Sequence, residues 1–105
     1  MDDIARGRLR HPGAAPELGE SIEAIAGVGG AVVEQILSGR LVGPVDYPGD
    51  VDEWVVVLAG RAQLEVAGTR LTLDPGDWML LPAGTPHRLV DTEPGTSWLT
   101  VTDRA

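Results

Sequence analysis

Residues 53–91 read EWVVVLAGRAQLEVAGTRLTLDPGDWMLLPAGTPHRLVD, and this stretch decides the fold. Short apolar runs are separated in it by turn residues: Ala67-Gly68 is a two-residue connection, and Asp74-Pro75-Gly76-Asp77 places Pro and then Gly in the middle of a turn. Along residues 62–66 apolar and polar side chains alternate, as a half-buried strand requires. The stretch therefore predicts short antiparallel strands joined by tight turns.

The same pattern continues from Ala31 towards the C-terminus, and Glu93-Pro94-Gly95-Thr96 repeats the Pro-Gly turn signal. The expected strands are residues 31–37, 53–59, 62–66, 69–73, 78–81, 87–91 and 97–102. Strands this short and this evenly spaced favour an all-β fold, an antiparallel sandwich or barrel. With 105 residues the chain is long enough for one domain.

The N-terminal part has a different pattern. Residues 1–15 follow neither secondary-structure period, so we expect a loosely held arm in which His11 is exposed. Leu18, Ile22 and Ile25 recur at helical spacing and Gly29-Gly30 follows them, which predicts one short helix over residues 16–26. The expected organisation is an arm and helix over residues 1–30 and a barrel over residues 31–105, together one structural domain.

Composition excludes several classes of partner. The net charge is −8 and every positive side chain is an arginine, so we expect no nucleic-acid partner. The longest apolar run, residues 54–59, is far short of the roughly 20 residues of a membrane-spanning helix, and the N-terminus lacks the apolar segment of a signal peptide. We therefore expect a soluble, cytoplasmic protein with no membrane partner. The absence of cysteine excludes disulfides and thiolate metal ligands.

The apolar run at residues 54–58 does not alternate. If Glu53, Val55 and Val57 face the interior, the intervening side chains form an apolar outer face that the helix, the arm or another subunit must cover. We expect a homodimer for this reason. Trp78 and Trp98 are interpreted as core residues.

Two segments resemble the cupins, specifically small single-domain members of the cupin-2 type. The second cupin motif, G-x5-P-x-G-x2-H-x3-N, matches at every position except the last, where Asp replaces Asn: Gly76, Pro82, Gly84, His87 and Asp91. The first motif, G-x5-H-x-H-x3,4-E-x6-G, matches only at its end, Glu53 and Gly60. Both of its histidines are missing. Their positions fall on Asp46 and Pro48, or on Tyr47 and Gly49, depending on the spacing chosen.

This resemblance implies an antiparallel jelly-roll barrel of a bacterial, usually dimeric group, with a small-molecule pocket. It further implies a divalent metal (Mn, Fe, Ni or Zn) held by Glu53 and His87, with Asp46 as the third ligand and Tyr47 and Asp91 lining the pocket. Asp50 and Asp52 are more typical of a solvated loop.

Three functions remain open, because cupin activities are diverse. One is a metal-dependent enzyme of isomerase, decarboxylase or hydrolase type, in which the metal polarises an oxygen. The second is a metal-free barrel that binds a small molecule as a carrier or sensor, or that transfers protons through His87 and Glu53. The third is an interaction scaffold. The sequence identifies neither the ligand nor the reaction.

Overall fold

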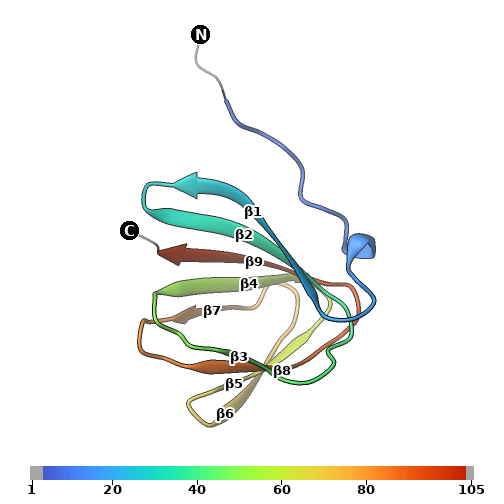
Figure 1. Cartoon of the computed structure of the whole chain (residues 1–105), viewed down its shortest axis with the longest axis vertical. Coiled ribbons are helices and arrows are strands. Elements are labelled where there is room, and N and C mark those ends of the chain that lie inside the picture. Colours follow the sequence, from blue (N-terminus) through green and yellow to red (C-terminus); the bar gives the residue numbers. More distant parts are fainter. Residues whose placement is uncertain (1–3, 104–105) are drawn as a thin grey trace.

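The computed structural model describes residues 4–103, which form two antiparallel sheets packed into a jelly-roll barrel (Figure 1). One sheet has the strand order β1 (Glu20–Val28), β2 (Ala31–Ser38), β9 (Thr96–Asp103), β4 (Glu53–Ala59) and β7 (Trp78–Leu81). The other has the order β3 (Val45–Tyr47), β8 (His87–Thr92), β5 (Ala62–Val66) and β6 (Thr69–Leu73). The all-β jelly-roll fold predicted from the sequence is confirmed.

The predicted turns explain why the strands end where they do. Gly76 and Gly95 have φ of 91° and 84°, a conformation that glycine adopts without strain. Each turn closes with a backbone hydrogen bond, from Asp77 N to the Asp74 carbonyl at 2.9 Å and from Thr96 N to the Glu93 carbonyl at 3.1 Å. The four predicted strands between residues 53 and 81 consequently match the observed bounds.

The helix predicted over residues 16–26 is wrong. Residues Glu20–Val28 are strand β1, and the helical turn in the described part of the chain is a 3-10 turn at Pro12–Ala14. A bulge between Ala24 and Ala26 interrupts the pairing of β1 with β2, and Ile22 and Ile25, three residues apart, lie on opposite faces of the strand, towards the interior and towards the arm. This irregular spacing imitates a helical period. Gly29, with φ of 58°, lies in a hairpin turn between β1 and β2 and does not end a helix.

The core lies between the two sheets. Its buried apolar side chains come from both of them: Ile36, Val55, Val57, Ala62, Leu64, Leu73, Leu81, Leu89 and Trp98. Val55 and Val57 therefore face the interior, which was the condition for an apolar outer face on this strand. No helix among residues 4–103 is long and apolar enough to cross a membrane.

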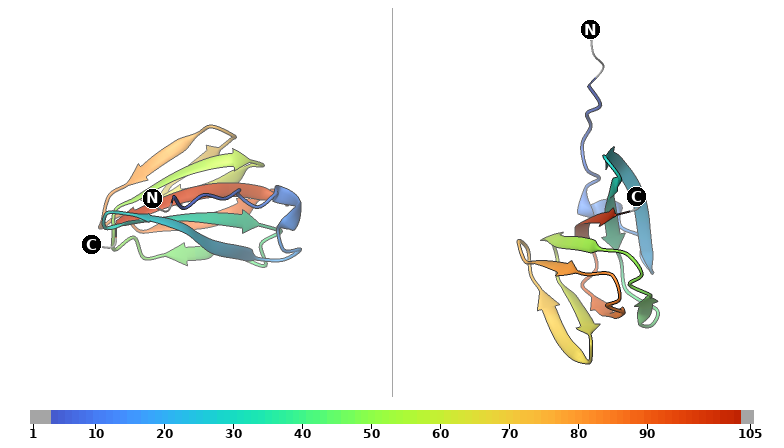
Figure 2. Two further views of the ribbon diagram at one scale, coloured as in Figure 1. Left: turned by 90° about the horizontal axis from the view of Figure 1, so that it is seen from above. Right: turned by 90° about the vertical axis from the view of Figure 1, so that its left-hand side faces the viewer.

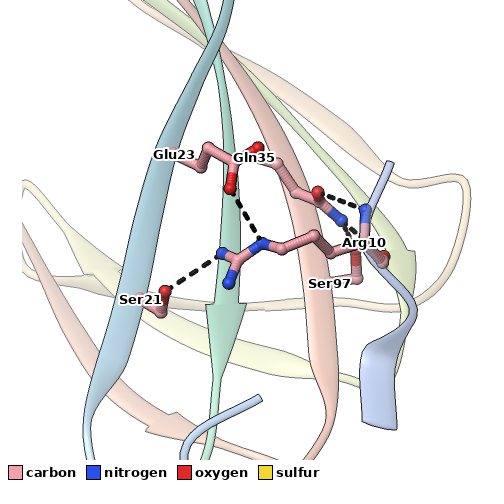
Figure 3. A network of polar contacts seen from close by, with 5 residues as sticks. All are labelled: Arg10, Ser21, Glu23, Gln35 and Ser97. Atoms are coloured by element: carbon pink, nitrogen blue, oxygen red, sulfur yellow. Dashed lines mark hydrogen bonds and ion pairs between the residues drawn. The ribbon is translucent and has the colours of Figure 1, made fainter. Parts of the chain in front are cut away.

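The arm covers part of the outer face of the five-stranded sheet, over β1, β2 and β9 (Figure 3). The backbone of Arg10 exchanges two hydrogen bonds of 2.9 Å with the side-chain amide of Gln35, which also donates to Ser97 Oγ at 3.2 Å. The Arg10 guanidinium donates to Ser21 Oγ at 3.0 Å and pairs with Glu23 at 3.3 Å. Gln35 is fully buried, so the arm satisfies polar groups that would otherwise be stranded. From this anchor the arm continues beside β1, where residues 5–9 and 23–26 line one surface groove, and its N-terminal end projects beyond the sheets (Figure 2).

The apolar stripe on β4 lies outside this covered region. Leu58 on β4 and Trp78 and Leu80 on β7 are exposed, and the ring of Trp78 lies 6.3 Å from that of Trp54. The interpretation of Trp78 as a core residue is therefore wrong, because on β7 its side chain points to the outer face. Trp98 is in the core.

Candidate functional site

Glu53 and His87 meet at one end of the barrel interior. Each is the first residue of its strand, β4 and β8, and each points inward. His87 Nε2 lies 3.3 Å from Glu53 Oε1, and the side chains are 4% and 26% exposed. The sequence motifs placed these two residues in one site, and the structure brings them together.

The hydrogen bonds of His87 determine which ring nitrogen carries a proton. Nδ1 lies 3.1 Å from the Thr85 carbonyl oxygen, which can only accept, so Nδ1 donates. Nε2 is thereby directed to Glu53. The hydrogen bond that His87 donates to the Glu53 carboxylate raises the pKa of His87, while burial opposes that shift. The pair therefore favours an imidazolium next to a carboxylate.

Tyr47 forms one wall of the site. Its ring stacks on that of His87, with centroids 5.4 Å apart and planes 16° apart. Its hydroxyl donates to Glu20 at 2.7 Å, and the second oxygen of Glu20 accepts from Ser38 at 2.7 Å. Burial and the Glu20 carboxylate raise the pKa of Tyr47, so the phenol stays protonated and keeps donating.

Glu20 was missed by the sequence analysis because it lay in the segment interpreted as a helix start. Trp98 Nε1 donates to Ser38 Oγ at 2.9 Å and extends the same chain of hydrogen bonds into the core. Assigning residues 20–28 to a strand with period two would have placed Glu20 and Ile22 on one face. Glu20 holds Tyr47 in place without contacting the cavity in the described structure.

A cavity of about 260 Å³ adjoins the pair. Ile22, Ile36 and Val51 supply apolar walls, and its polar lining is Glu34, Asp50, Glu53, His87, Thr100 and Thr102. Thr100 lies on the inward face of β9 and is 4% exposed, yet its Oγ1 has no hydrogen-bond partner among the described residues. Sequence reasoning missed Thr100, because an inward threonine in an apolar strand gives no signal.

Asp46 is not part of this arrangement. On β3 successive side chains point to opposite faces, so with Tyr47 inward Asp46 points outward. Its carboxylate pairs with Arg88 Nε at 2.7 Å and is 73% exposed. Both residues line a separate, larger surface groove of about 650 Å³ that reaches the outer side of Tyr47 and His87. The expectation that Asp46 joins Glu53 and His87 as a third ligand is not met by this geometry.

Asp91 is also displaced from the cavity. It follows His87 by four residues, and simple alternation would point both inward, but a bulge in β8 intervenes: Gln63 pairs with Asp91 and Leu64 pairs with Leu89. The extra residue, Val90, reverses the alternation. Asp91 is exposed and lines a groove outside the barrel, so the structure does not place it in the pocket.

The two remaining acidic candidates, Asp50 and Asp52, lie in different surroundings. Asp52 Oδ1 accepts a hydrogen bond of 2.7 Å from Ala83 N, which ties the loop before β4 to the loop before β8. Asp50 lines the cavity. Gly49 supports the same junction, since its carbonyl accepts from Gly84 N at 2.8 Å.

The side chains present do not fit the implied divalent metal. Catalytic metal sites generally have three protein ligands, and nowhere in residues 4–103 do three or more His, Asp or Glu side chains gather so that they could hold an ion. Glu53 and His87 supply two, and the ring of Tyr47 occupies the neighbouring side.

Comparison with known proteins agrees with the fold. The Cupin domain family matches residues 32–102. A Ralstonia eutropha protein provisionally named mannose-6-phosphate isomerase is 31% identical, with TM-score 0.76, covering 94% of this chain and 100% of that one. KdgF from Halomonas sp. is 20% identical (TM-score 0.74, 83% and 82% covered), and a cupin superfamily protein from Desulfitobacterium hafniense is 18% identical (0.74, 99% and 97%). No curated protein matches significantly. Because the family match spans most of the chain and coincides with its barrel, this protein belongs to the cupin family.

Proposed function

We propose that this cupin is a small-molecule-binding barrel in which His87 and Glu53 recognise the ligand directly, without a resident metal. The observation that carries the proposal is the paired imidazole and carboxylate, 3.3 Å apart, on the wall of a cavity that also has apolar sides. Binding sites typically combine apolar walls with a few polar groups that converge on the ligand. At about 260 Å³ the cavity suits a compact ligand.

Metal analysis separates this proposal from a metal-dependent enzyme. The wild-type protein, His87→Ala and Glu53→Ala are each loaded with Mn, Fe, Ni or Zn, desalted and analysed for metal content. We expect no stoichiometric metal that depends on either side chain. One equivalent bound by the wild type and lost in both variants would overturn the metal-free proposal.

Proton transfer is a second candidate, favoured by the isomerase name of the Ralstonia relative and by the His87–Glu53 pair. An imidazole with a raised pKa beside a carboxylate can give and take a proton on a sugar or carbonyl ligand. The test is hydrogen exchange: mannose and fructose are incubated with the protein in D2O, and deuterium at the carbon next to the carbonyl is followed by NMR. Exchange that disappears in His87→Gln supports catalysis, and its absence leaves a binding protein.

We also propose that the chain forms a homodimer through the apolar outer stripe. Trp78 and Leu80 are each 61% exposed and Leu58 is 41% exposed, and all three lie on the adjacent strands β4 and β7. A contiguous apolar patch of this kind is typical of protein interfaces. The anchored arm covers the opposite part of the sheet, over β1, β2 and β9, and leaves this stripe free.

A further inference from the structure

The two residues of the His87–Glu53 pair come from different sheets. Glu53 begins β4 in the five-stranded sheet, and His87 begins β8 in the four-stranded sheet. Within the described part of the chain no strand pairing joins these sheets, so no ladder of backbone hydrogen bonds fixes the 3.3 Å between His87 Nε2 and Glu53 Oε1. The core sets the spacing of the sheets only as a whole. The placement of two side chains at one end of the barrel therefore depends on the loops at that end.

Two loops cross between the sheets at this end of the barrel (Figure 1). Residues 48–52 connect β3 to β4, and residues 82–86 connect β7 to β8. Asp52 joins the two loops, because its Oδ1 accepts a hydrogen bond of 2.7 Å from Ala83 N. Its backbone carbonyl accepts one of 3.1 Å from Asp103 N of β9, so Asp52 is itself fixed to the five-stranded sheet. Since the next residue begins β4, these contacts tie the start of β4 to the loop that leads into β8.

Gly49 brings the same two loops into close contact beside the imidazole. Its carbonyl accepts a hydrogen bond of 2.8 Å from Gly84 N, and its φ is 69°. A Cβ at this position would collide with the carbonyl of Thr85, so only glycine lets the loops approach this closely. The same Thr85 carbonyl accepts from Nδ1 of His87 at 3.1 Å. Any displacement of this carbonyl would therefore be passed on to the imidazole ring.

We infer that Asp52 and Gly49 are positioning residues for the imidazole of His87. Asp52 holds the loop before β8 against the start of β4, and Gly49 keeps the Thr85 carbonyl where it receives the Nδ1 proton. The ring is then held at both nitrogens, by Thr85 and by Glu53, before any ligand arrives, and such preorganisation lowers the cost of binding. This inference rests on the proposed function, in which the pair recognises the ligand, and specifies what holds that pair in place.

The test is the exchange of the two imidazole N–H protons with water, measured by NMR on the ligand-free protein in EDTA, at a pH where the ring is charged. Each proton is protected only while its hydrogen bond persists. We expect the Nδ1 proton in Gly49→Ala, and both protons in Asp52→Ala, to exchange at least about tenfold faster than in the wild type, which corresponds to about 1.4 kcal/mol. The indole N–H of Trp98, which donates to Ser38 in the core at 2.9 Å, is the internal reference. Rates are compared relative to it, because opening of the whole barrel would release that proton as well.

Two control variants separate positioning from other effects. Asp52→Asn removes the same charge as Asp52→Ala but keeps an oxygen that can accept from Ala83 N, so its imidazole protons should exchange at close to the wild-type rate. Gly60→Ala matches Gly49→Ala in backbone strain, with φ of 82° at Gly60, and in the collision of the added Cβ. That collision is with Thr96, at the opposite end of β4, so the relative exchange rates of the imidazole protons should not change.

Three results would overturn the inference. One is unchanged imidazole exchange in Asp52→Ala. Another is equal acceleration in Asp52→Ala and Asp52→Asn, which would show an effect of charge alone. The third is equal acceleration in Gly49→Ala and Gly60→Ala, which would show a general loosening; if Gly49→Ala does not fold, the two Asp52 variants decide. All three leave the proposed function standing, whereas metal held through His87 and Glu53 overturns that function without changing exchange rates measured in EDTA.

Discussion

Thr100→Val is expected to stabilise the free protein, although most substitutions of buried residues destabilise. Thr100 is 4% exposed and its Oγ1 has no hydrogen-bond partner among the described residues. A buried hydroxyl in that state costs about 1–3 kcal/mol, and the methyl that replaces it has nearly the same shape. Allowing for partial relaxation around the hydroxyl, we expect a gain of about 1–2 kcal/mol. In a chain of this length each 1 kcal/mol raises Tm by roughly 4–8 °C.

The matched control is Thr92→Val. Thr92 is also 4% exposed, but its hydroxyl donates to the Gly39 carbonyl at 2.8 Å. Losing that bond and stranding the carbonyl should destabilise the protein by about 1–2 kcal/mol. Urea unfolding shows whether each variant has a higher or a lower free energy of unfolding than the wild type, provided that its m-value matches that of the wild type. If both variants are destabilised to the same extent, the Thr100 hydroxyl already has a partner, such as an ordered water, and the reasoning is refuted.

Three other outcomes are expected. In Glu53→Gln the pKa of His87, followed by NMR titration, should fall, because the Glu53 hydrogen bond raises it. Because the pKa of His87 is raised in the folded protein, the pair's contribution to stability is fully present below about pH 6.5 and is lost as the pH rises through the folded pKa. Free energies of unfolding that depend on pH in the same way in the variant and the wild type would contradict this. Gly60→Ala should lower the free energy of unfolding, measured in urea, by more than about 2 kcal/mol, because Gly60 has φ of 82° and an added Cβ would collide with Thr96, the first residue of β9. A smaller loss would mean that β9 shifts to make room for the added Cβ. Light scattering should show a dimer that Trp78→Ser with Leu80→Ser converts to a monomer, whereas a monomeric wild type would rule out the interface.

Turn chemistry explains how much of the fold could be predicted. Pro-Gly and Ala-Gly pairs require particular backbone angles, so they mark strand ends almost residue by residue between residues 53 and 81. Strand β1 could not be predicted, because its bulge between Ala24 and Ala26 breaks the period of two. The three-residue strand β3 is too short to show any period.

The site was predictable only where spacing alone determines position. Glu53 and His87 begin their strands, and the irregularities of β4, between Val57 and Ala59, and of β8 both come after them. Asp91 follows a bulge, which cannot be seen in a single sequence, and it therefore points outward. Asp46 was favoured for its chemistry as a ligand, but orientation on β3 decides between it and Tyr47.

Tyr47 also bears on why no three candidate metal ligands gather among the described residues of a chain that keeps the family fold. With the shorter motif spacing, Tyr47 stands where the resemblance expects a histidine. An inward histidine there could join Glu53 and His87 as a third ligand, whereas the phenol is held away by Glu20 and its ring stacks flat against His87. The phenol oxygen is directed to Glu20, to which its hydroxyl donates at 2.7 Å, so the ring face and not the oxygen lies against the imidazole. With Tyr47 held in this way the imidazole and the carboxylate pair with each other, and under the proposed metal-free function this pair would meet a ligand directly.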